Sequence, residues 1–196
     1  MSNTATNRRD QLLETATELF YRNGCHTIGI DRVLAEAGVA KMTLYKHFKS
    51  KENLVLAAAE RFNEKLREEF EEAVERDNLP ARERLLTIFQ FMEHWGRRED
   101  FCGCPSINLA VQYPDRNHPV HRAAADHKRA RIDYVTRLAR EAGARDPEQL
   151  GEQLVLLIEG TTVALQVTGD TSLITRARQA AGILIDAQVE WPQDRR

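Results

Sequence analysis

Apolar side chains recur at intervals of three and four residues along most of the 196-residue chain, which is the period of a helix packed on one face. No alternating run of β-branched residues, the pattern typical of strands, occurs in the sequence. Glycine and proline fall mainly between the apolar stripes, where they are expected to end one helix or to open the next. The sequence therefore predicts an all-α protein of about nine helices.

Four helices are expected in the N-terminal part. The first should end at Asn23-Gly24 and the second at Gly38, because glycine readily adopts the left-handed conformation that closes a helix. A third, short helix should cover about 41–48. Ser50 can then cap a fourth helix that runs to about Arg76.

The C-terminal part predicts five further helices, most of them long. Asp146, Pro147 and Glu148 give the clearest start, since they supply a capping side chain, a fixed φ and an acid in the order that a helix N-terminus favours. The expected ranges are about 80–99, 107–113, 119–142, 147–168 and 171–190.

Charge is distributed unevenly along the chain. The whole carries −2, but residues 1–51 hold eight Lys and Arg against five Asp and Glu, a net +3 that leaves −5 for the rest. A basic segment in an acidic chain is one indication of a nucleic-acid partner.

The sequence has no run of about 18 successive uncharged apolar residues and no signal peptide, so no membrane span or export is expected. Three cysteines, an odd number, fit a cytoplasmic location.

The segment from Val39 to Lys51 holds four lysines and no acid. On a helix, Leu44 and Phe48 share an inward face, and the opposite face carries Met42, Thr43, Lys46 and Lys49. Together with the preceding helix, residues 30–48 have the dimensions of a helix-turn-helix, whose second helix reads base edges in the major groove. A solvated helix face with no function is the alternative.

The string from Gly38 to Leu54, GVAKMTLYKHFKSKENL, with RRDQLLETATELFYRNG before it, resembles the DNA-binding domain of the TetR family of bacterial regulators. The resemblance covers about residues 8–56. It implies an all-helical homodimer with a three-helix helix-turn-helix domain at 1–52 and a larger ligand-binding and dimerisation domain at 53–196. It also implies a transcriptional regulator, in most cases a repressor, that releases a palindromic operator in double-stranded DNA when a small molecule binds.

The resemblance assigns base contacts to Lys41, Met42, Thr43 and Lys46, and phosphate contacts to Tyr45, His47 and Lys51. One position departs from the family pattern. Many relatives place a phosphate-binding threonine ten residues before the glycine of the turn, where this chain has Ile28, and the threonine falls at Thr27. Either Thr27 or backbone N–H groups near Gly29 take over this contact, or it is absent.

The last two long helices carry apolar faces that predict a dimer interface, and the resemblance implies a four-helix bundle between subunits. Glycine within a helix costs up to about 1 kcal/mol relative to alanine, and close helix approach is one reason to tolerate it. The alternative is that both helices pack only within their own subunit. The expected interface residues are Leu154, Ile158, Gly160, Leu165, Ala181, Leu184 and Ile185.

An effector pocket is expected among the helices of the C-terminal part. An apolar cavity with a few polar anchors is the usual form of a small-molecule site, so the effector is predicted to be largely apolar and uncharged. Aromatic and methionine side chains at helical spacing are more often plain core, which is the alternative. The candidate pocket residues are Phe89, Met92, Trp95, Ile107, Val111, Glu159 and Gln166.

Cys102 and Cys104 form a C-x-C pair, and His118, His121 and His127 follow nearby. These residue types raise the alternative of a metal- or thiol-responsive regulator, although their spacing matches no structural zinc signature. No glycine-rich phosphate loop, nucleophile elbow or catalytic carboxylate pair is found, so neither an enzyme nor a cofactor is predicted. No metal site is assigned.

Overall fold

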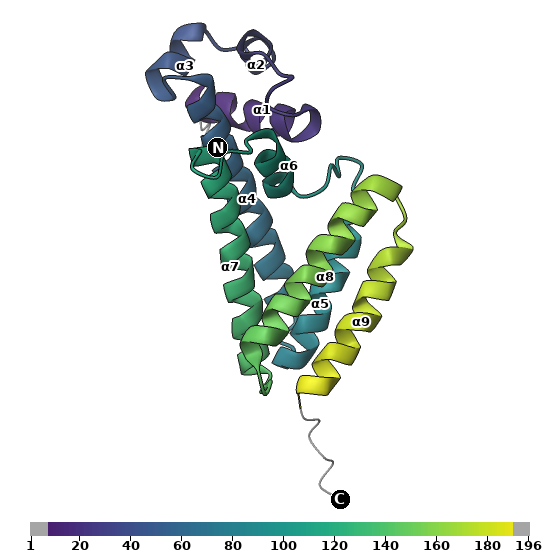
Figure 1. Cartoon of the computed structure of the whole chain (residues 1–196). Helices are drawn as coiled ribbons and strands as arrows, with labels where there is room; N and C mark the ends of the chain where they lie inside the picture. Colours follow the sequence, from purple (N-terminus) through teal and green to yellow (C-terminus); the bar gives the residue numbers. More distant parts are fainter. Residues whose placement is uncertain (1–7, 190–196) are drawn as a thin grey trace, which may run out of the picture. The chain divides into compact units, whose positions relative to one another are not determined.

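The computed structural model describes residues 8–189, and these residues form nine α-helices with no strand among them (Figure 1). The all-α prediction is therefore confirmed. The helices are α1 Arg8–Asn23, α2 Ile30–Ala37, α3 Lys41–His47, α4 Lys51–Glu75, α5 Ala81–Gly96, α6 Pro105–Gln112, α7 Pro119–Glu141, α8 Pro147–Thr168 and α9 Ser172–Gln188.

The helix ends follow the local signals closely. Asp146 caps α8 by accepting a hydrogen bond at Oδ1 from the Gln149 N–H at 3.0 Å, and Gly169 ends the same helix with φ +68°. Ser50 Oγ likewise accepts from the Asn53 N–H at 3.1 Å at the start of α4. The predicted end of the last helix at residue 190 lies outside the described residues. Capping is decided within one turn, which is why these boundaries could be predicted.

The chain forms two compact units. The first holds the described residues up to Leu66 together with Pro105–His127, and the second holds Arg67–Cys104 together with the described residues from Lys128 on. Both α4 and α7 therefore contribute to both units. The predicted functional division at residue 52 falls at the start of α4, whereas the compact first unit also includes α6.

The core of the first unit is built by α1, α2, α3 and the first turns of α4, with Leu109 and Val120 added from α6 and α7. Leu44 and Phe48 are 1% and 5% exposed in this core, so the predicted inward face of the short third helix is confirmed. Burial of two large apolar residues, each worth about 1.5–3 kcal/mol, fixes how this seven-residue helix is rotated.

The core of the second unit is built by the end of α4 with α5, α7, α8 and α9. Two glycines allow close helix contact there. A Cβ added at Gly96 would lie 2.4 Å from Leu165 Cδ2, and one added at Gly151 would lie 2.9 Å from the Thr136 Cα. These contacts leave room for no side chain larger than hydrogen.

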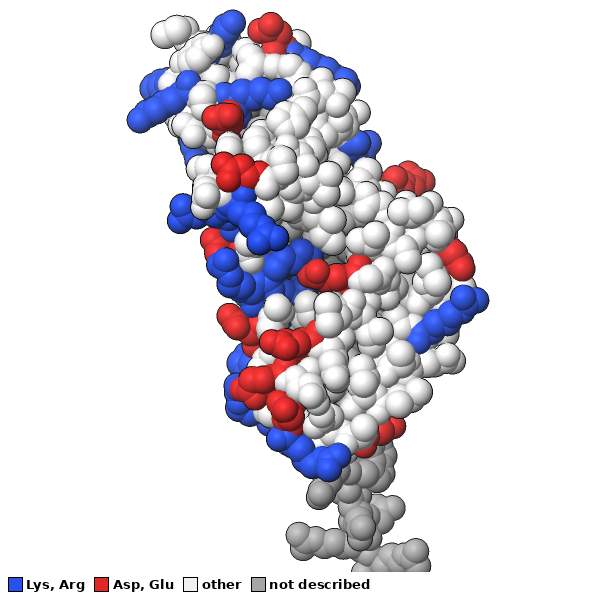
Figure 2. All heavy atoms as spheres, in the orientation of Figure 1, with Lys and Arg blue, Asp and Glu red and all other residues white. Residues whose placement is uncertain are grey.

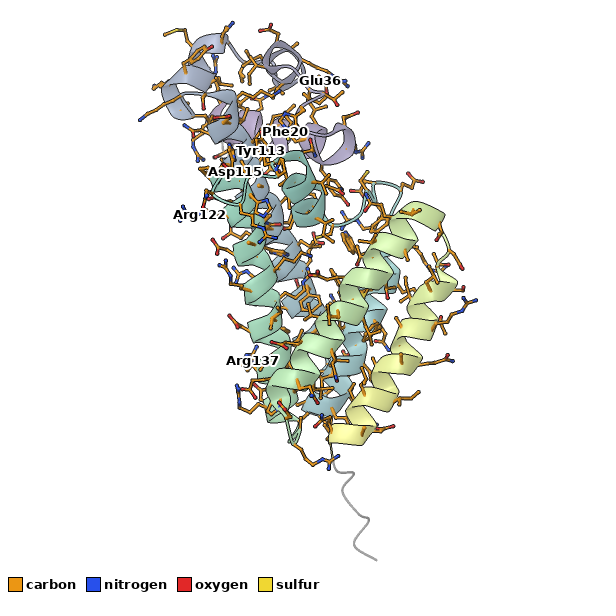
Figure 3. All side chains as sticks on the ribbon, in the orientation of Figure 1. Phe20, Glu36, Tyr113, Asp115, Arg122 and Arg137 are labelled. Atoms are coloured by element: carbon orange, nitrogen blue, oxygen red, sulfur yellow. The ribbon has the colours of Figure 1, made fainter. Side chains whose placement is uncertain are left out.

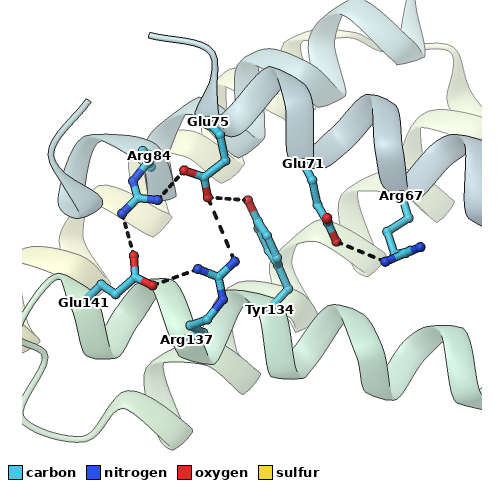
Figure 4. Close-up of polar contacts among 7 residues, drawn as sticks. All are labelled: Arg67, Glu71, Glu75, Arg84, Tyr134, Arg137 and Glu141. Atoms are coloured by element: carbon cyan, nitrogen blue, oxygen red, sulfur yellow. Dashed lines mark hydrogen bonds and ion pairs between the residues drawn. The ribbon is translucent and has the colours of Figure 1, made fainter. Parts of the chain in front are cut away.

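A network of charges joins α4, α5 and α7 at one end of the second unit (Figure 4). Arg84 donates to Glu75 at 2.5 Å and to Glu141 at 2.6 Å, and Arg137 donates to Glu141 at 2.8 Å. The Tyr134 hydroxyl donates to Glu75 at 3.1 Å, and burial together with the Glu75 charge raises the pKa of Tyr134. Three helices are thereby tied by charge-assisted hydrogen bonds, which are stronger than neutral ones.

One helix among the described residues, α8, is long and apolar enough by length and composition to cross a membrane. Such a helix is also typical of a protein core, and Leu154, Ile158 and Leu165 of α8 are buried in the second unit.

Candidate DNA-binding surface and effector region

A tight turn connects α2 to α3. Gly38 closes α2 with φ +62°, and its N–H donates to Ala35 O at 3.2 Å while the Val39 N–H donates to Leu34 O at 3.1 Å. This pattern of two backward hydrogen bonds ends a helix sharply and requires a residue at ease with positive φ. Residues 38–40 thus bring α3 directly after α2, as the sequence predicts for a helix-turn-helix.

The outer face of α3 presents large side chains to solvent. Met42 is 76% exposed and Tyr45 is 50% exposed, while Lys41, Lys46 and His47 are also exposed and Thr43 is half-buried. In Figure 2 blue side chains gather at the end of the first unit that carries α2 and α3. An exposed methionine and tyrosine between lysines can offer apolar contact to base edges as well as charge to phosphates.

Carboxylates are scarce beside these lysines. Within residues 8–189, no carboxylate oxygen pairs with the ammonium groups of Lys46, Lys49 or Lys51, and Lys41 lies at the limit of pairing, 4.0 Å from an exposed Asp31. Three lysines without internal counter-charge leave a local positive potential that attracts an external anion.

Lys49 has an unusual backbone conformation. Its φ is +66°, in the left-handed region that side chains other than glycine and asparagine seldom adopt. Its N–H donates to Leu44 O at 3.2 Å, so the residue closes α3 as a glycine commonly does. The turn then passes to Ser50, which caps α4, and places half-buried Lys51 in the first turn of that helix.

The position that departs from the family pattern is buried. Ile28 is 1% exposed and belongs to the core of the first unit, so its side chain cannot reach a phosphate. Thr27 is exposed beside it, and Gly29 precedes α2. Two of the alternatives for the phosphate contact therefore stay open, namely the exposed Thr27 hydroxyl and the backbone N–H groups at the start of α2.

Most of the residues predicted for the dimer interface are instead core of the single chain. A side chain with almost no exposed surface cannot contact a partner, so this assignment needs correction: Leu154, Ile158, Leu165, Ala181 and Ile185 are each 4% exposed or less. Leu184 is half-buried and packs against the same core, whereas Gly160 is exposed.

The exposed apolar side chains of α8 and α9 lie on different residues. Leu156 is 71% exposed, Val163 40%, Val167 78% and Ile183 71%. With Gly160, the three residues of α8 recur at intervals of four, three and four and so form one outward stripe. Figure 2 shows that the face of α8 and α9 turned to the viewer is almost free of charged side chains. The helical spacing of these apolar residues is visible in the sequence. Because α8 also has a second apolar face, that spacing does not identify which face is exposed.

The residues predicted for the effector pocket do not come together around one cavity. Phe89 and Met92 are 1% and 3% exposed and pack into the second core, so their alternative as core residues holds. Trp95 packs edge-on against Phe101, with the ring centroids 4.9 Å apart. Ile107 and Val111 belong to the first unit, where Val111 is 75% exposed.

The two polar residues predicted for the pocket hold the C-x-C loop. Glu159 accepts from Lys128 Nζ at 2.7 Å, and the same ammonium group lies 3.3 Å from the Cys104 Sγ. Gln166 Nε2 donates to Cys102 O at 3.0 Å, and its side chain occupies the space where a Cβ of Gly103 would lie. The thiol of Cys104 is buried, and Cys102 is partly exposed.

A groove that the sequence did not predict lies between α4 and α5 in the second unit. Its volume is about 560 Å³, within the range of small-molecule sites. Trp95 and Phe91 contribute aromatic surface, and charged side chains of Glu69, Glu72, Arg76, Asp77 and Arg98 also line it. A much smaller cavity of about 30 Å³ lies between α1, α4 and α6 in the first unit.

Metal-ligating side chains do not gather in the part of the chain that the structure describes, where no three His, Cys, Asp or Glu could hold one ion. His121 Nδ1 instead lies 2.7 Å from Tyr113 O, and His127 is buried. The metal-responsive alternative therefore gains no support from the geometry.

Comparison with known proteins agrees with this architecture. The family model for bacterial regulatory proteins of the tetR family matches residues 12–58, and the model for the tetracyclin repressor-like C-terminal domain matches residues 81–181. A solved structure of SCO4454, a TetR-family transcriptional regulator from Streptomyces coelicolor, has a TM-score of 0.85 at 33% identity and covers 93% of this chain and 96% of that one.

Two sequence relatives are also named as regulators. The HTH-type transcriptional activator FasR from Mycolicibacterium smegmatis is 40% identical over 91 residues, which is 44% of this chain and 41% of FasR, so the chain matches less than half of that protein. The HTH-type transcriptional regulator LmrA from Bacillus subtilis is 25% identical over 167 residues, 84% of this chain and 88% of LmrA. The two family models and the similarity to SCO4454 show that this chain belongs to the TetR family of bacterial transcriptional regulators.

Proposed function

We propose that this DNA-binding regulator is a cytoplasmic, ligand-responsive repressor that releases a palindromic operator when a small molecule binds the second unit. The observation that carries most weight is the outer face of α3, where Lys46 and Lys49 have no carboxylate partner among the described residues while Leu44 and Phe48 are buried behind them. A short helix anchored on one side and cationic on the other suits the major groove.

Within this proposal the DNA contacts divide by chemistry. Lys41, Met42, Thr43 and Lys46 face base edges, and Tyr45, His47, Lys51 and Thr27 bind phosphates. Lys51 lies in the first turn of α4, where a cation opposes the helix dipole unless an external anion is present. A phosphate there would interact favourably with both the ammonium group and the free N–H groups of the helix.

Dimerisation is proposed to use the outward stripe of α8, formed by Leu156, Gly160, Val163 and Val167, together with Ile183 of α9. Exposed apolar side chains on an uncharged face support this assignment, because such patches mark interaction surfaces. A twofold dimer presents two helix-turn-helix units to DNA. The half-sites of its operator are therefore expected to lie about one turn of DNA apart, roughly 34–36 Å.

The effector is proposed to bind in the second unit, with the groove between α4 and α5 as the site that offers the volume. Its aromatic lining by Phe91 and Trp95 suits an apolar ring system. Its charged lining suits a polar group on the same molecule, so the wholly uncharged effector expected from the sequence fits this groove less well.

A second candidate is a regulator that responds to thiol reagents. The C-x-C pair favours it, because Cys102 is partly exposed and the Lys128 ammonium group lies 3.3 Å from the Cys104 Sγ. Release from DNA after treatment with iodoacetamide, and no release for a variant of the partly exposed cysteine, Cys102→Ser, would support this candidate over the small-molecule effector.

The main proposal is tested by selecting duplexes from a random-sequence library with the purified protein. Enrichment of a palindrome supports sequence-specific dimer binding, and its absence would contradict the proposal. Mass spectrometry of small molecules retained by the same preparation identifies effector candidates. Adding each one back to the selected complex should raise the Kd for DNA, and an effector that lowers the Kd would reverse the proposed direction of control.

A further inference from the structure

Gln112, the last residue of α6, holds the turn between α1 and α2. Its Oε1 accepts hydrogen bonds from the Cys25 N–H at 2.8 Å, from the Cys25 thiol at 3.1 Å and from the His26 N–H at 3.4 Å. Its Nε2 donates to Asn108 O at 3.1 Å, which orients the amide within α6. One side-chain oxygen therefore accepts hydrogen bonds from three donors of Cys25 and His26, which lie 87 and 86 residues away in sequence.

The backbone of the turn makes few other hydrogen bonds. Gly24 has φ +80°, and its backbone supplies only the hydrogen bonds that close α1 and a long one of 3.4 Å from the Ile28 N–H to Gly24 O. A Cβ added at Gly24 would lie 3.1 Å from Gln112 Oε1, so the amide fits closely against this turn. Cys25 is fully buried, and its N–H would lose its acceptor without Gln112.

Tyr113, the next residue along the chain (Figure 3), adds aromatic contacts beside this turn. Its ring lies 4.9 Å from the His26 ring and stacks on the His118 ring at 4.5 Å. His118 Nε2 in turn lies 3.8 Å from Glu52 Oε1. His26 Nε2 also lies 2.8 Å from Gln112 O, so the two α6 residues and the turn form one packed cluster.

The cluster includes the sequence neighbours of two residues that are proposed to bind phosphate, Thr27 and Lys51. His26 precedes Thr27, and Glu52 follows Lys51. We infer that Gln112 and Tyr113 are positioning residues for DNA binding, which set the places of Thr27 and Lys51 without touching DNA themselves. This inference rests on the proposed phosphate roles of those two residues.

The physical reason is preorganisation. A phosphate contact from a loose turn must first order that turn, and the ordering reduces the affinity that the contact provides. Gln112 orders the turn beforehand by supplying the acceptor that its buried N–H requires. Removing that acceptor should lower DNA affinity although no DNA contact has been removed.

The test measures the Kd for a duplex that the unchanged protein has selected from a random library. Gln112→Met keeps the length of the side chain and removes the acceptor, so the Kd should rise roughly tenfold, in line with the cost of a buried donor left unpaired. Gln112→Glu keeps an acceptor oxygen and should restore the Kd to within about threefold. Gln11→Met, the same change at an exposed position of α1, is the matched control and should bind as the unchanged protein does.

A double-mutant cycle separates positioning from general destabilisation. If Gln112 acts through Thr27, adding Thr27→Val to Gln112→Met should change the Kd by less than about twofold, although Thr27→Val alone weakens binding. Tyr113→Leu should lower the slope of log K against log salt by about one, as loss of the Lys51 contact would, and Tyr113→Phe should leave it unchanged.

Three outcomes would overturn the inference. These are a Gln112→Met protein that binds DNA like the unchanged one, additive losses in the cycle with Thr27→Val, or no rescue by Gln112→Glu in a protein that unfolds at the same urea concentration as the unchanged one. Failure of the proposed function itself would be recognised earlier, because the unchanged protein would then enrich no duplex.

Discussion

Leu165 of α8 occupies the space beside Gly96 of α5, so that a Cβ added at Gly96 would lie 2.4 Å from the leucine Cδ2. Gly96 is the last residue of its helix, and its missing side chain lets two long core helices meet. The relationship joins a residue that is usually destabilising in a helix to a contact that alanine could keep only if the leucine side chain moved.

Gly96→Ala is expected to destabilise the protein by about 1–3 kcal/mol, because overpacking forces the leucine or the backbone to move. Gly182→Ala in α9 is the control, since no neighbouring atom lies within 4 Å of its added Cβ. Urea unfolding of both proteins checks the prediction, and equal midpoints for the two alanine variants would contradict it.

Leu156→Lys on the outward stripe of α8 is expected to give a monomer with nearly unchanged secondary structure, because a charge on an apolar interface disfavours association. Leu154→Ala should instead lower stability by about 2–5 kcal/mol as a core cavity forms. Light scattering after gel filtration measures the mass, and a dimeric Leu156→Lys protein would place the interface elsewhere.

Lys46→Ala and Lys51→Ala should have different effects on DNA binding. The first is expected to change or relax operator preference, whereas the second should weaken binding to all sequences and lower the salt slope by about one. Competition between selected and scrambled duplexes at several salt concentrations distinguishes them. Equal loss on both duplexes for Lys46→Ala would contradict its assignment to base edges.

Glu141 should contribute to acid sensitivity. Its pKa is lowered from the ordinary value of 4.5, mainly by the hydrogen bond from Arg137 and secondarily by that from Arg84. Because the folded pKa is the lower one, this stabilisation is complete above about pH 4.5 and is lost as the pH falls through the folded pKa.

The urea midpoint of Glu141→Gln should therefore lie below that of the unchanged protein at pH 7, and the two should converge as the pH falls through the lowered pKa of Glu141. Glu93→Gln, which removes an exposed pair with Arg97 at the C-terminal end of α5, is the control and should shift the midpoint less. A gap between the two midpoints that stays constant with pH would show that ionisation of Glu141 is not responsible.

The helices and the inward face of α3 could be predicted because their signals are local. Gly38, Ser50 and Asp146 act within one turn, and Leu44 and Phe48 are one turn apart. Such patterns need no knowledge of what the helix packs against.

The dimer face could not be assigned in the same way because α8 is apolar on two sides. Leu154 and Ile158 face the core, while Leu156 and Val163 face solvent, and periodicity does not say which stripe meets the chain's own helices. The residues Glu159 and Gln166 were similarly ambiguous. Gln166 binds Cys102 across 64 residues of sequence, a partner that no local pattern indicates.

At Lys49, which has a left-handed backbone conformation, selection for thermal stability and selection for DNA binding favour different residues. A residue other than glycine in that conformation costs roughly 1–2 kcal/mol, so Lys49→Gly should make the protein more resistant to heat. The same change removes a cation from the side proposed to face DNA. A population evolving toward thermal robustness alone would thus lose this lysine early, and its persistence in a lineage would report continuing use of the reading head.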